Sequence, residues 1–145
     1  MKKNLFYSLL MISLLLIAGK CKKKDDGTQA PAGVKGSWKI NSITNSAGTT
    51  PTNLQNLVNG SAIFGNTDYE FKNANGSSAE AGGTYSYDAA NSKLNMTPAG
   101  NSVFTNANAP YTFDATLAGN NLQLSLNIAP PNKPSNVITV SLTKN

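Results

Sequence analysis

The sequence predicts an all-β fold, a small antiparallel up-and-down β-barrel of about eight strands. Three observations lead to this prediction. From residue 33 onward, apolar and polar side chains alternate along most segments, which is the period of a half-buried strand. Asn, Gly, Pro and Ser interrupt the alternation at short intervals, as residues of tight turns do. No stretch of twelve residues in this part has helical periodicity, so helices are expected to contribute little.

A β-sandwich is the alternative fold for seven or eight short strands. The short spacing between successive segments favours the barrel, because a Greek-key sandwich needs at least one longer crossing connection. Full closure would also remove the exposed strand edges that otherwise pair with neighbouring molecules.

The first half of the domain has short alternating segments. Four pairs of apolar residues, each pair separated by one residue, predict four strands. These pairs are Trp38 and Ile40, Tyr69 and Phe71, Tyr85 and Tyr87, and Leu94 and Met96. The segment 52–59 (TNLQNLVN) is expected to form at most one or two helical turns. The sequence DAAN at 88–91 predicts a tight hairpin, whereas Asn75 and Gly76 lie in a longer loop.

The second half has three longer alternating segments, at 111–117, 122–128 and 138–142. In each, apolar side chains alternate with Thr, Ser, Gln, Asn or Asp, as expected of a strand with one dry face. The sequence AGNN at 118–121 predicts a tight hairpin between the first two segments. The segment 129–135 (APPNKPS) cannot continue a strand, because its three prolines lack N–H donors.

The charge distribution gives no support to a nucleic-acid partner. The chain has a formal net charge of +5, but it contains no arginine, and half of its twelve lysines lie in the first 24 residues. From residue 31 onward, six lysines stand against five acidic residues. Nucleic-acid-binding domains use clustered cations and the bidentate arginine fork. We therefore expect no nucleic acid among the partners.

Residues 1–20 have the layout of a secretory signal peptide. Lys2 and Lys3 precede fourteen mostly apolar residues at 5–18, which end in small residues. As a helix, this run would extend about 21 Å, which is short of the roughly 30 Å hydrocarbon core of a bilayer. Export is therefore expected rather than a permanent membrane span.

Cys21, the only cysteine, stands directly after this leader. The sequence IAGKC at 17–21 resembles the lipobox of bacterial lipoproteins, in which the chain is cut before the cysteine. The resemblance implies a diacylglycerol on the Cys21 sulfur and a fatty acyl chain such as palmitate on the new amino group. Lys20 stands where lipoboxes have a small residue, which leaves the cleavage site open. The alternative for Cys21 is a spare thiol in an ordinarily secreted chain.

The segment 21–32 would then be a lipidated tether that places the protein at an outer membrane. Its polar sequence, KKKDDGTQAPA at 22–32, has no apolar periodicity and suits a flexible linker. The lysine followed by two aspartates resembles the short export signal of some surface lipoproteins of Gram-negative bacteria. Periplasmic and cell-surface orientations both stay open.

Gly36-Ser37-Trp38 opens the first strand of the domain at 33–145. This resembles the Gly-x-Trp signature of the lipocalins, and the layout of the domain is similar to the lipocalin-like domains of small bacterial lipoproteins. The resemblance implies that Trp38 closes one end of the barrel, with Gly36 relieving backbone crowding beside it. Lipocalins usually place an arginine near the chain end over this Trp. Here Lys144 is the candidate for that contact.

The resemblance also implies a barrel that binds a small hydrophobic ligand. Six aromatic residues on the predicted strands are the candidates to line the cavity: Tyr69, Phe71, Tyr85, Tyr87, Tyr111 and Phe113. The same rings could instead fill the core, because an eight-stranded barrel holds little more than its own side chains or one small ligand. The alternative function is therefore a cell-surface structural lipoprotein, or one that contacts proteins or glycans through its polar loops. The oligomeric state stays open.

We expect no enzymatic activity, no cofactor and no metal. The absence of His and the single Cys exclude histidine acid–base catalysis, a Cys/His zinc site and an internal disulfide. Asp68 with Glu70, or Asp88 with Asp114, could supply paired carboxylates, but each also fits an outward polar position of a strand. The sequence 66–68 (NTD) offers oxygen ligands without the spacing of a calcium loop.

Overall fold

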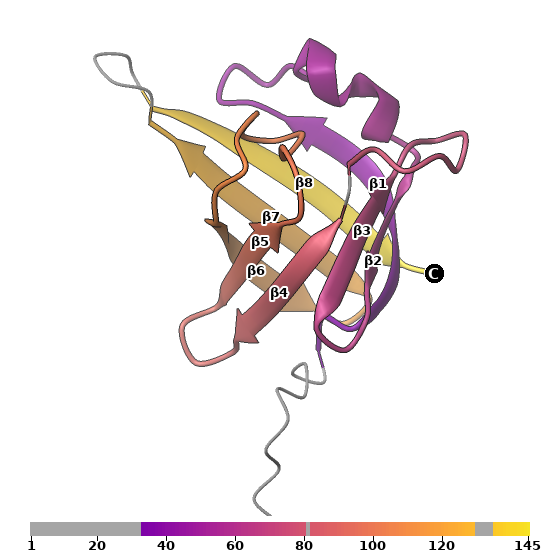
Figure 1. Ribbon diagram of the computed structural model, residues 1–145, viewed down its shortest axis with the longest axis vertical. Helices are drawn as coiled ribbons and strands as arrows, with labels where there is room; N and C mark the ends of the chain where they lie inside the picture. The colour runs from indigo at the N-terminus through magenta and orange to yellow at the C-terminus, as the bar shows by residue number, and fades with distance from the viewer. Residues whose placement is uncertain (1–32, 81, 130–134) are drawn as a thin grey trace, which may run out of the picture.

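The computed structural model describes residues 33–80, 82–129 and 135–145. Eight antiparallel strands form one closed barrel, in which each strand pairs with the next along the chain and β8 pairs with β1 (Figure 1). This up-and-down order confirms the predicted barrel and excludes the sandwich. The predicted signal peptide at 1–20, the tether at 21–32 and residues 130–134 of the proline-rich segment lie outside the described residues.

The strands follow the chain in order, with a single short 3₁₀ helix, η1, among the described elements. Their bounds are β1 (Gly36–Thr44), η1 (Thr52–Leu57), β2 (Ser61–Phe64), β3 (Asp68–Lys72), β4 (Gly83–Asp88), β5 (Lys93–Pro98), β6 (Tyr111–Ala118), β7 (Asn121–Ile128) and β8 (Asn136–Lys144). Within the described part of the chain, no helix has the length and apolar character needed to cross a bilayer.

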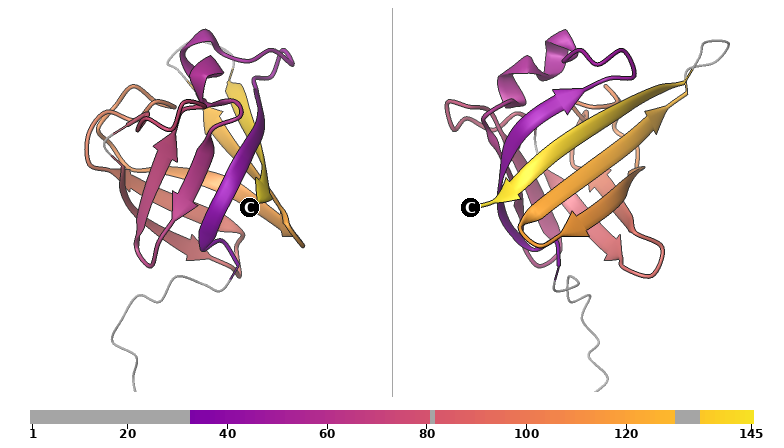
Figure 2. Two further views of the ribbon diagram at one scale, coloured as in Figure 1. Left: turned by 90° about the vertical axis from the view of Figure 1, so that its right-hand side faces the viewer. Right: turned by 180° about the vertical axis from the view of Figure 1, so that it is seen from behind.

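The connections divide the barrel into two different ends (Figures 1 and 2). The end that we call the loop end carries the long connections 45–60, 73–82 and 99–110. The opposite end, the turn end, carries the short connections 65–67, 89–92 and 119–120. The two predicted hairpins, at 88–91 and 118–121, are therefore confirmed. The helical turns predicted within 52–59 are also present as η1, whose Leu54 and Leu57 are buried.

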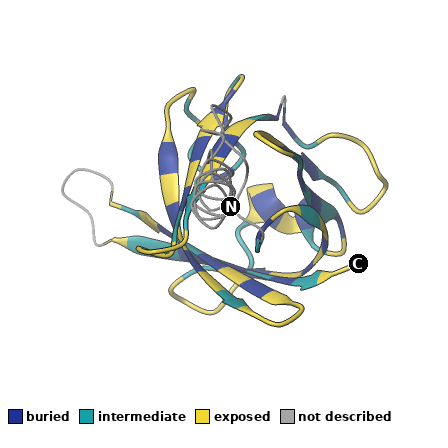
Figure 3. Cartoon of the chain, turned by 90° about the horizontal axis from the view of Figure 1, so that it is seen from below, coloured by how far each residue is buried: buried dark blue, intermediate teal, exposed yellow. Residues whose placement is uncertain are grey.

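Alternating inward side chains build the core, as the strand patterns predicted. On β6, β7 and β8, every second residue is buried along most of the strand, and Figure 3 shows the resulting alternation of buried and exposed positions. On β1 the buried residues are Trp38, Ile40 and Ile43, so the last interval is three residues rather than two. A register shift against β8 between Ile40 and Ser42 produces this interval, because a β-bulge inserts one unpaired residue.

Trp38 fills the turn end of the barrel. Its side chain is completely buried, and the indole Nε1–H donates to the carbonyl of Val34 over 2.7 Å. The Nζ atom of Lys144 lies 5.4 Å from the ring centroid, within cation–π distance. Gly36 has φ of +133°, and a Cβ there would lie 3.3 Å from the Lys144 side chain. Glycine at this position therefore provides both the backbone conformation and the space for the lysine.

Candidate functional site at the loop end of the barrel

The six aromatic residues predicted to line a cavity lie on three strands, β3, β4 and β6. All except Tyr87, which is half-buried, are at most 8% exposed. Tyr69, Phe71, Tyr111 and Phe113 belong to one connected group of rings. Tyr85 instead packs against Phe64, with ring centroids 5.1 Å apart, and its hydroxyl donates to the carbonyl of Gly65 over 2.8 Å.

The ring that joins this group comes from a loop rather than a strand. Phe104, in the connection between β5 and β6, is 4% exposed. Its centroid lies 5.1 Å from that of Phe71, 5.4 Å from Phe113 and 6.4 Å from Tyr111. The first two contacts are edge-to-face, the arrangement that aromatic pairs prefer. We call the strand residues Phe71, Tyr111 and Phe113 the aromatic box, and Phe104 occupies it.

A buried polar cluster adjoins the aromatic box. Glu80, from the β3–β4 connection, is 9% exposed, and its Oε2 accepts a hydrogen bond of 2.9 Å from the backbone N–H of Val103. Its Oε1 is buried and has no hydrogen-bond partner. The Ser102 hydroxyl oxygen accepts from the N–H of Phe104 over 3.2 Å. Two loops are thus joined through Glu80, directly beside the residue that occupies the box.

Two tyrosine hydroxyls face this cluster. The Tyr69 and Tyr111 oxygen atoms lie 3.5 Å apart. The negative charge of the Glu80 carboxylate contributes to raising the pKa of both phenols. Tyr69 lies opposite Gly83 of β4. A Cβ at position 83 would lie 2.2 Å from the Thr97 carbonyl oxygen and 2.8 Å from the Tyr69 ring, so both the neighbouring strand and the ring require glycine there.

Burial controls the ionisation of these groups. It raises the pKa of Glu80, and the nearby Val103 amide and the Tyr69 and Ser102 hydroxyls lower that pKa by less. Burial also raises the pKa of Tyr111 to about 12 and raises that of Tyr69 further. Both phenols therefore stay protonated at neutral pH and are available as hydrogen-bond donors.

The raised pKa of Glu80 predicts that the wild type loses stability as the pH rises. The folded chain holds this proton more tightly than the unfolded chain, so ionisation favours unfolding. We expect the free energy of unfolding to decrease as the pH rises from the usual glutamate pKa, about 4.3, to the raised pKa of Glu80 in the folded chain. Each tenfold difference in proton affinity between the folded and unfolded chains corresponds to about 1.4 kcal/mol. Urea denaturation of the wild type and of Glu80→Gln across this range measures the effect.

The difference between these two proteins isolates Glu80, because all other groups titrate in both. Tyr69 and Tyr111, the titratable groups that face it, stay neutral throughout the range. The stability of Glu80→Gln relative to the wild type should therefore increase with pH and then level off. Parallel curves for the two proteins would contradict the burial of an ionisable carboxyl.

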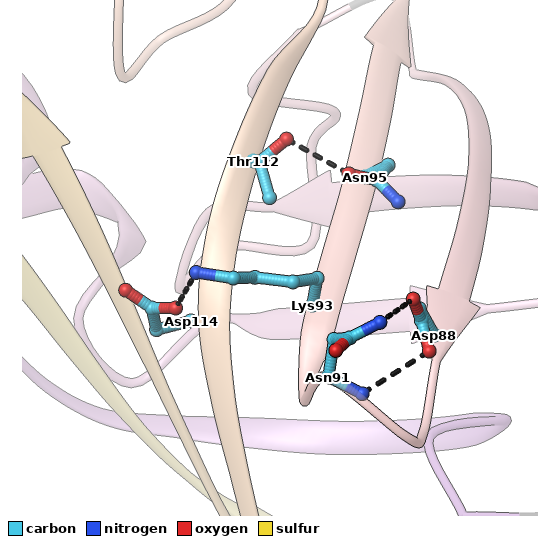
Figure 4. A network of polar contacts seen from close by, with 6 residues as sticks. All are labelled: Asp88, Asn91, Lys93, Asn95, Thr112 and Asp114. Carbon is cyan, nitrogen blue, oxygen red and sulfur yellow. Dashed lines mark hydrogen bonds and ion pairs between the residues drawn. The ribbon is translucent and has the colours of Figure 1, made fainter.

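Three of the four acidic residues considered as paired carboxylates have separate partners on the outer surface, and the fourth, Asp68, is exposed. Asp88 accepts hydrogen bonds from the Asn91 side chain over 2.7 Å and from the Asn91 backbone over 3.2 Å, which lowers its pKa (Figure 4). Asp114 forms an ion pair with Lys93 on the neighbouring strand (Figure 4). Glu70 forms an ion pair with Lys72, in which the Lys72 Nζ atom lies 3.5 Å from the Glu70 Oε2 atom. These contacts fit the outward polar positions that were the alternative interpretation.

The described residues also give no metal-binding cluster. No three His, Cys, Asp or Glu side chains come together in this part of the chain. In the segment 66–68, considered for calcium, the Asn66 side-chain oxygen accepts a hydrogen bond from Lys35.

Two hollows lie elsewhere on the molecule. One of about 300 Å³ lies at the loop end and is lined by Gln55, Asn56, Asn73, Ala74 and Asn75. The other, of about 330 Å³, involves β1, β6, β7 and β8 and is lined by Asn41, Thr116, Ala118, Asn121, Leu122, Gln123, Ser141 and Leu142. Neither is lined by any of the six aromatic residues predicted to contact a ligand.

Two residues of this site could not be found from the sequence pattern. Phe104 and Glu80 lie in loops, where no periodicity indicates which side chains point inward. Both are placed by the closure of the barrel, which brings the β3–β4 and β5–β6 connections together at the same end. The only sequence signal for Phe104 is a large apolar residue within a polar loop.

Fold and site together define a small closed antiparallel barrel with an aromatic, partly polar loop end. No protein-family model matches the chain, and no curated protein matches it.

Proposed function

We propose that this chain is an exported lipoprotein, held at an outer membrane by lipid on Cys21, whose lipocalin-like barrel binds a small hydrophobic molecule. Export and lipid attachment are supported by the leader and the single cysteine, and the lipocalin-like barrel is supported by the Gly36-x-Trp38 sequence. The described chain enters the barrel at the turn end, where β1 begins. A tether attached there leaves the loop end, with the aromatic box, on the side away from the anchor.

The occupation of the box by Phe104 is the observation that carries the ligand-binding proposal. The walls of the box belong to strands held by ladder hydrogen bonds, whereas Phe104 belongs to a loop. That loop is held by a few contacts, among them Val103 N–H to Glu80 and the Asn53 side-chain amide to the Val103 carbonyl, at 3.0 Å. A ligand ring or chain that replaces Phe104 would gain the same apolar contacts.

Replacing Phe104 with alanine is expected to strengthen the binding of a neutral hydrophobic dye, N-phenyl-1-naphthylamine. In the wild type, the dye must displace a side chain whose burial is worth about 1.5–3 kcal/mol. Removing that competition corresponds to about a ten- to hundredfold tighter dissociation constant. The measurement is a fluorescence titration of residues 33–145 of each protein, with circular dichroism to establish that both are folded.

The matched control is Val103→Ala, which truncates the neighbouring apolar side chain and keeps both Phe104 and the Val103 N–H bond to Glu80. We expect its dye affinity to stay close to that of the wild type. The proposal is wrong if folded Phe104→Ala does not bind the dye, or if Val103→Ala changes the affinity as much as Phe104→Ala does.

A second candidate function is supported by the polar hollow at the loop end. Its walls carry three asparagines and a glutamine, Asn56, Asn73, Asn75 and Gln55, whose amides can donate and accept hydrogen bonds to a glycan or a peptide. In that case the barrel would be a scaffold for the surface and Phe104 a permanent part of its core. A Phe104→Ala protein that unfolds or binds no dye would favour this alternative.

A further inference from the structure

The unpaired oxygen of Glu80 is the feature of the loop end that the binding of an apolar ligand does not use. Buried polar atoms in folded proteins nearly always have a hydrogen-bond partner. Among the described residues, Glu80 Oε1 is the buried side-chain oxygen or nitrogen atom without one. The Tyr69 and Ser102 hydroxyls lie near the Glu80 carboxyl, but neither forms a hydrogen bond to Oε1. Glu80, a residue only 9% exposed, therefore has an acceptor atom without a donor beside the aromatic box.

No cation of the described chain fills this position. Five lysines are described. Lys72 and Lys93 pair with Glu70 and Asp114, Lys35 donates to Asn66, Lys144 lies over Trp38, and Lys39 is exposed on the outer face of β1. No ion pair to Glu80 is found among the described residues. A buried carboxylate without a counterion is costly, and a ligand that brings a cation removes that cost.

We propose that Glu80 is the head-group site for a ligand with a protonated amine and an apolar body. This inference rests on the proposed function, because the body of the ligand would replace Phe104 in the aromatic box. The ammonium N–H groups would donate to Oε1, while the Val103 N–H keeps its bond to Oε2. The carboxylate attracts an ammonium and repels a carboxylate, so the site selects amines over fatty acids of equal length.

Competition among three ligands of the same chain length tests this selectivity. N-phenyl-1-naphthylamine is bound to Phe104→Ala at neutral pH and displaced with decylamine, decanol or decanoate. A charge-assisted hydrogen bond predicts that decylamine displaces the dye at about tenfold lower concentration than decanol, with decanoate weakest. In Phe104→Ala/Glu80→Gln, the amide still accepts from Val103 and the preference for decylamine should disappear. Phe104→Ala/Glu70→Gln, which loses a surface carboxylate, should keep it.

A second measurement does not depend on the folding of the Glu80 variant. The chain contains only two glutamates, Glu70 and Glu80, so ¹³C-labelled glutamate gives two side-chain carboxyl signals. Decylamine added to Phe104→Ala is expected to shift the Glu80 signal and to leave the Glu70 signal unchanged. The spectrum of Phe104→Ala/Glu70→Gln, which lacks one of the two signals, shows which signal belongs to which residue.

The outcomes separate the two proposals. If folded Phe104→Ala binds no dye, the proposed function is wrong and the head-group site is wrong with it. If the dye binds but decylamine and decanoate displace it equally, or if decylamine leaves the Glu80 signal unchanged, the head-group site alone is wrong. Preferential displacement by decanoate would assign the site to fatty acids and would also overturn the amine proposal.

Discussion

Replacing Trp38 with alanine is expected to lower the free energy of unfolding by about 3–5 kcal/mol. The indole is fully buried at the turn end, and its removal leaves a cavity that the surrounding strands can fill only in part. The substitution also leaves the Val34 carbonyl without the indole N–H and removes the surface on which Lys144 lies. Urea denaturation of residues 33–145, followed by circular dichroism, measures the loss.

Two control variants separate the packing of the indole from its polar contacts. Trp38→Phe keeps an aromatic ring and loses the N–H donor, so a smaller loss than that of the alanine variant is expected. Lys144→Ala removes the cation–π contact, which is worth about 0.5–1 kcal/mol at an exposed site, together with the packing of the lysine side chain beside Gly36. A Trp38→Ala protein as stable as Lys144→Ala would contradict the role of Trp38 in closing the barrel.

Replacing Cys21 with serine is expected to release the full-length protein from the membrane. A single acyl chain gives marginal binding, whereas two or more anchor a protein stably, at about 0.8 kcal/mol for each buried methylene. In the proposed function the Cys21 sulfur carries the diacylglycerol, so the serine variant could not form the acylated anchor. Expression in a Gram-negative bacterium, fractionation and intact mass measurement of both proteins test this expectation.

The mass also locates the cleavage site. The wild type should be cut before Cys21 and be heavier than the remaining polypeptide by its acyl groups. Lys20→Ala, which supplies the small residue typical of a lipobox, should be processed at least as completely. A wild type recovered in the soluble fraction with an unmodified Cys21 thiol would contradict the anchor.

Seven of the eight strands could be predicted: β1, β3, β4 and β5 from one pair of apolar residues each, and β6, β7 and β8 from longer uninterrupted alternation. β6, β7 and β8 carry eight or nine residues of regular period two, so the sequence pattern and the burial agree. β2 could not be predicted because it has four residues, of which Ala62 is small and Ile63 points away from the core. The bulge in β1 could not be predicted from the local sequence either, because it depends on the pairing of β1 with β8.

The residues of the candidate site that lie on strands could be predicted from the sequence, whereas those that lie in loops could not. Phe71, Tyr111 and Phe113 were predicted to line a cavity because each lies on the apolar face of a strand, and the structure gathers them around one point. Tyr87 lies outside this group, and Tyr85 reaches it only through Phe64. Phe104 and Glu80 are placed by contacts between distant loops, which leave no local pattern in the sequence.

The position of a bound dye tests most directly whether Phe104 occupies the place of a ligand. Nuclear Overhauser contacts are measured between N-phenyl-1-naphthylamine and Phe104→Ala in solution. We expect contacts from the dye to the side chains of Phe71, Tyr111 and Phe113, the box that Phe104 fills in the wild type. Contacts only to the outer hollow around Asn41 and Thr116, with none to the box, would contradict ligand binding inside the barrel.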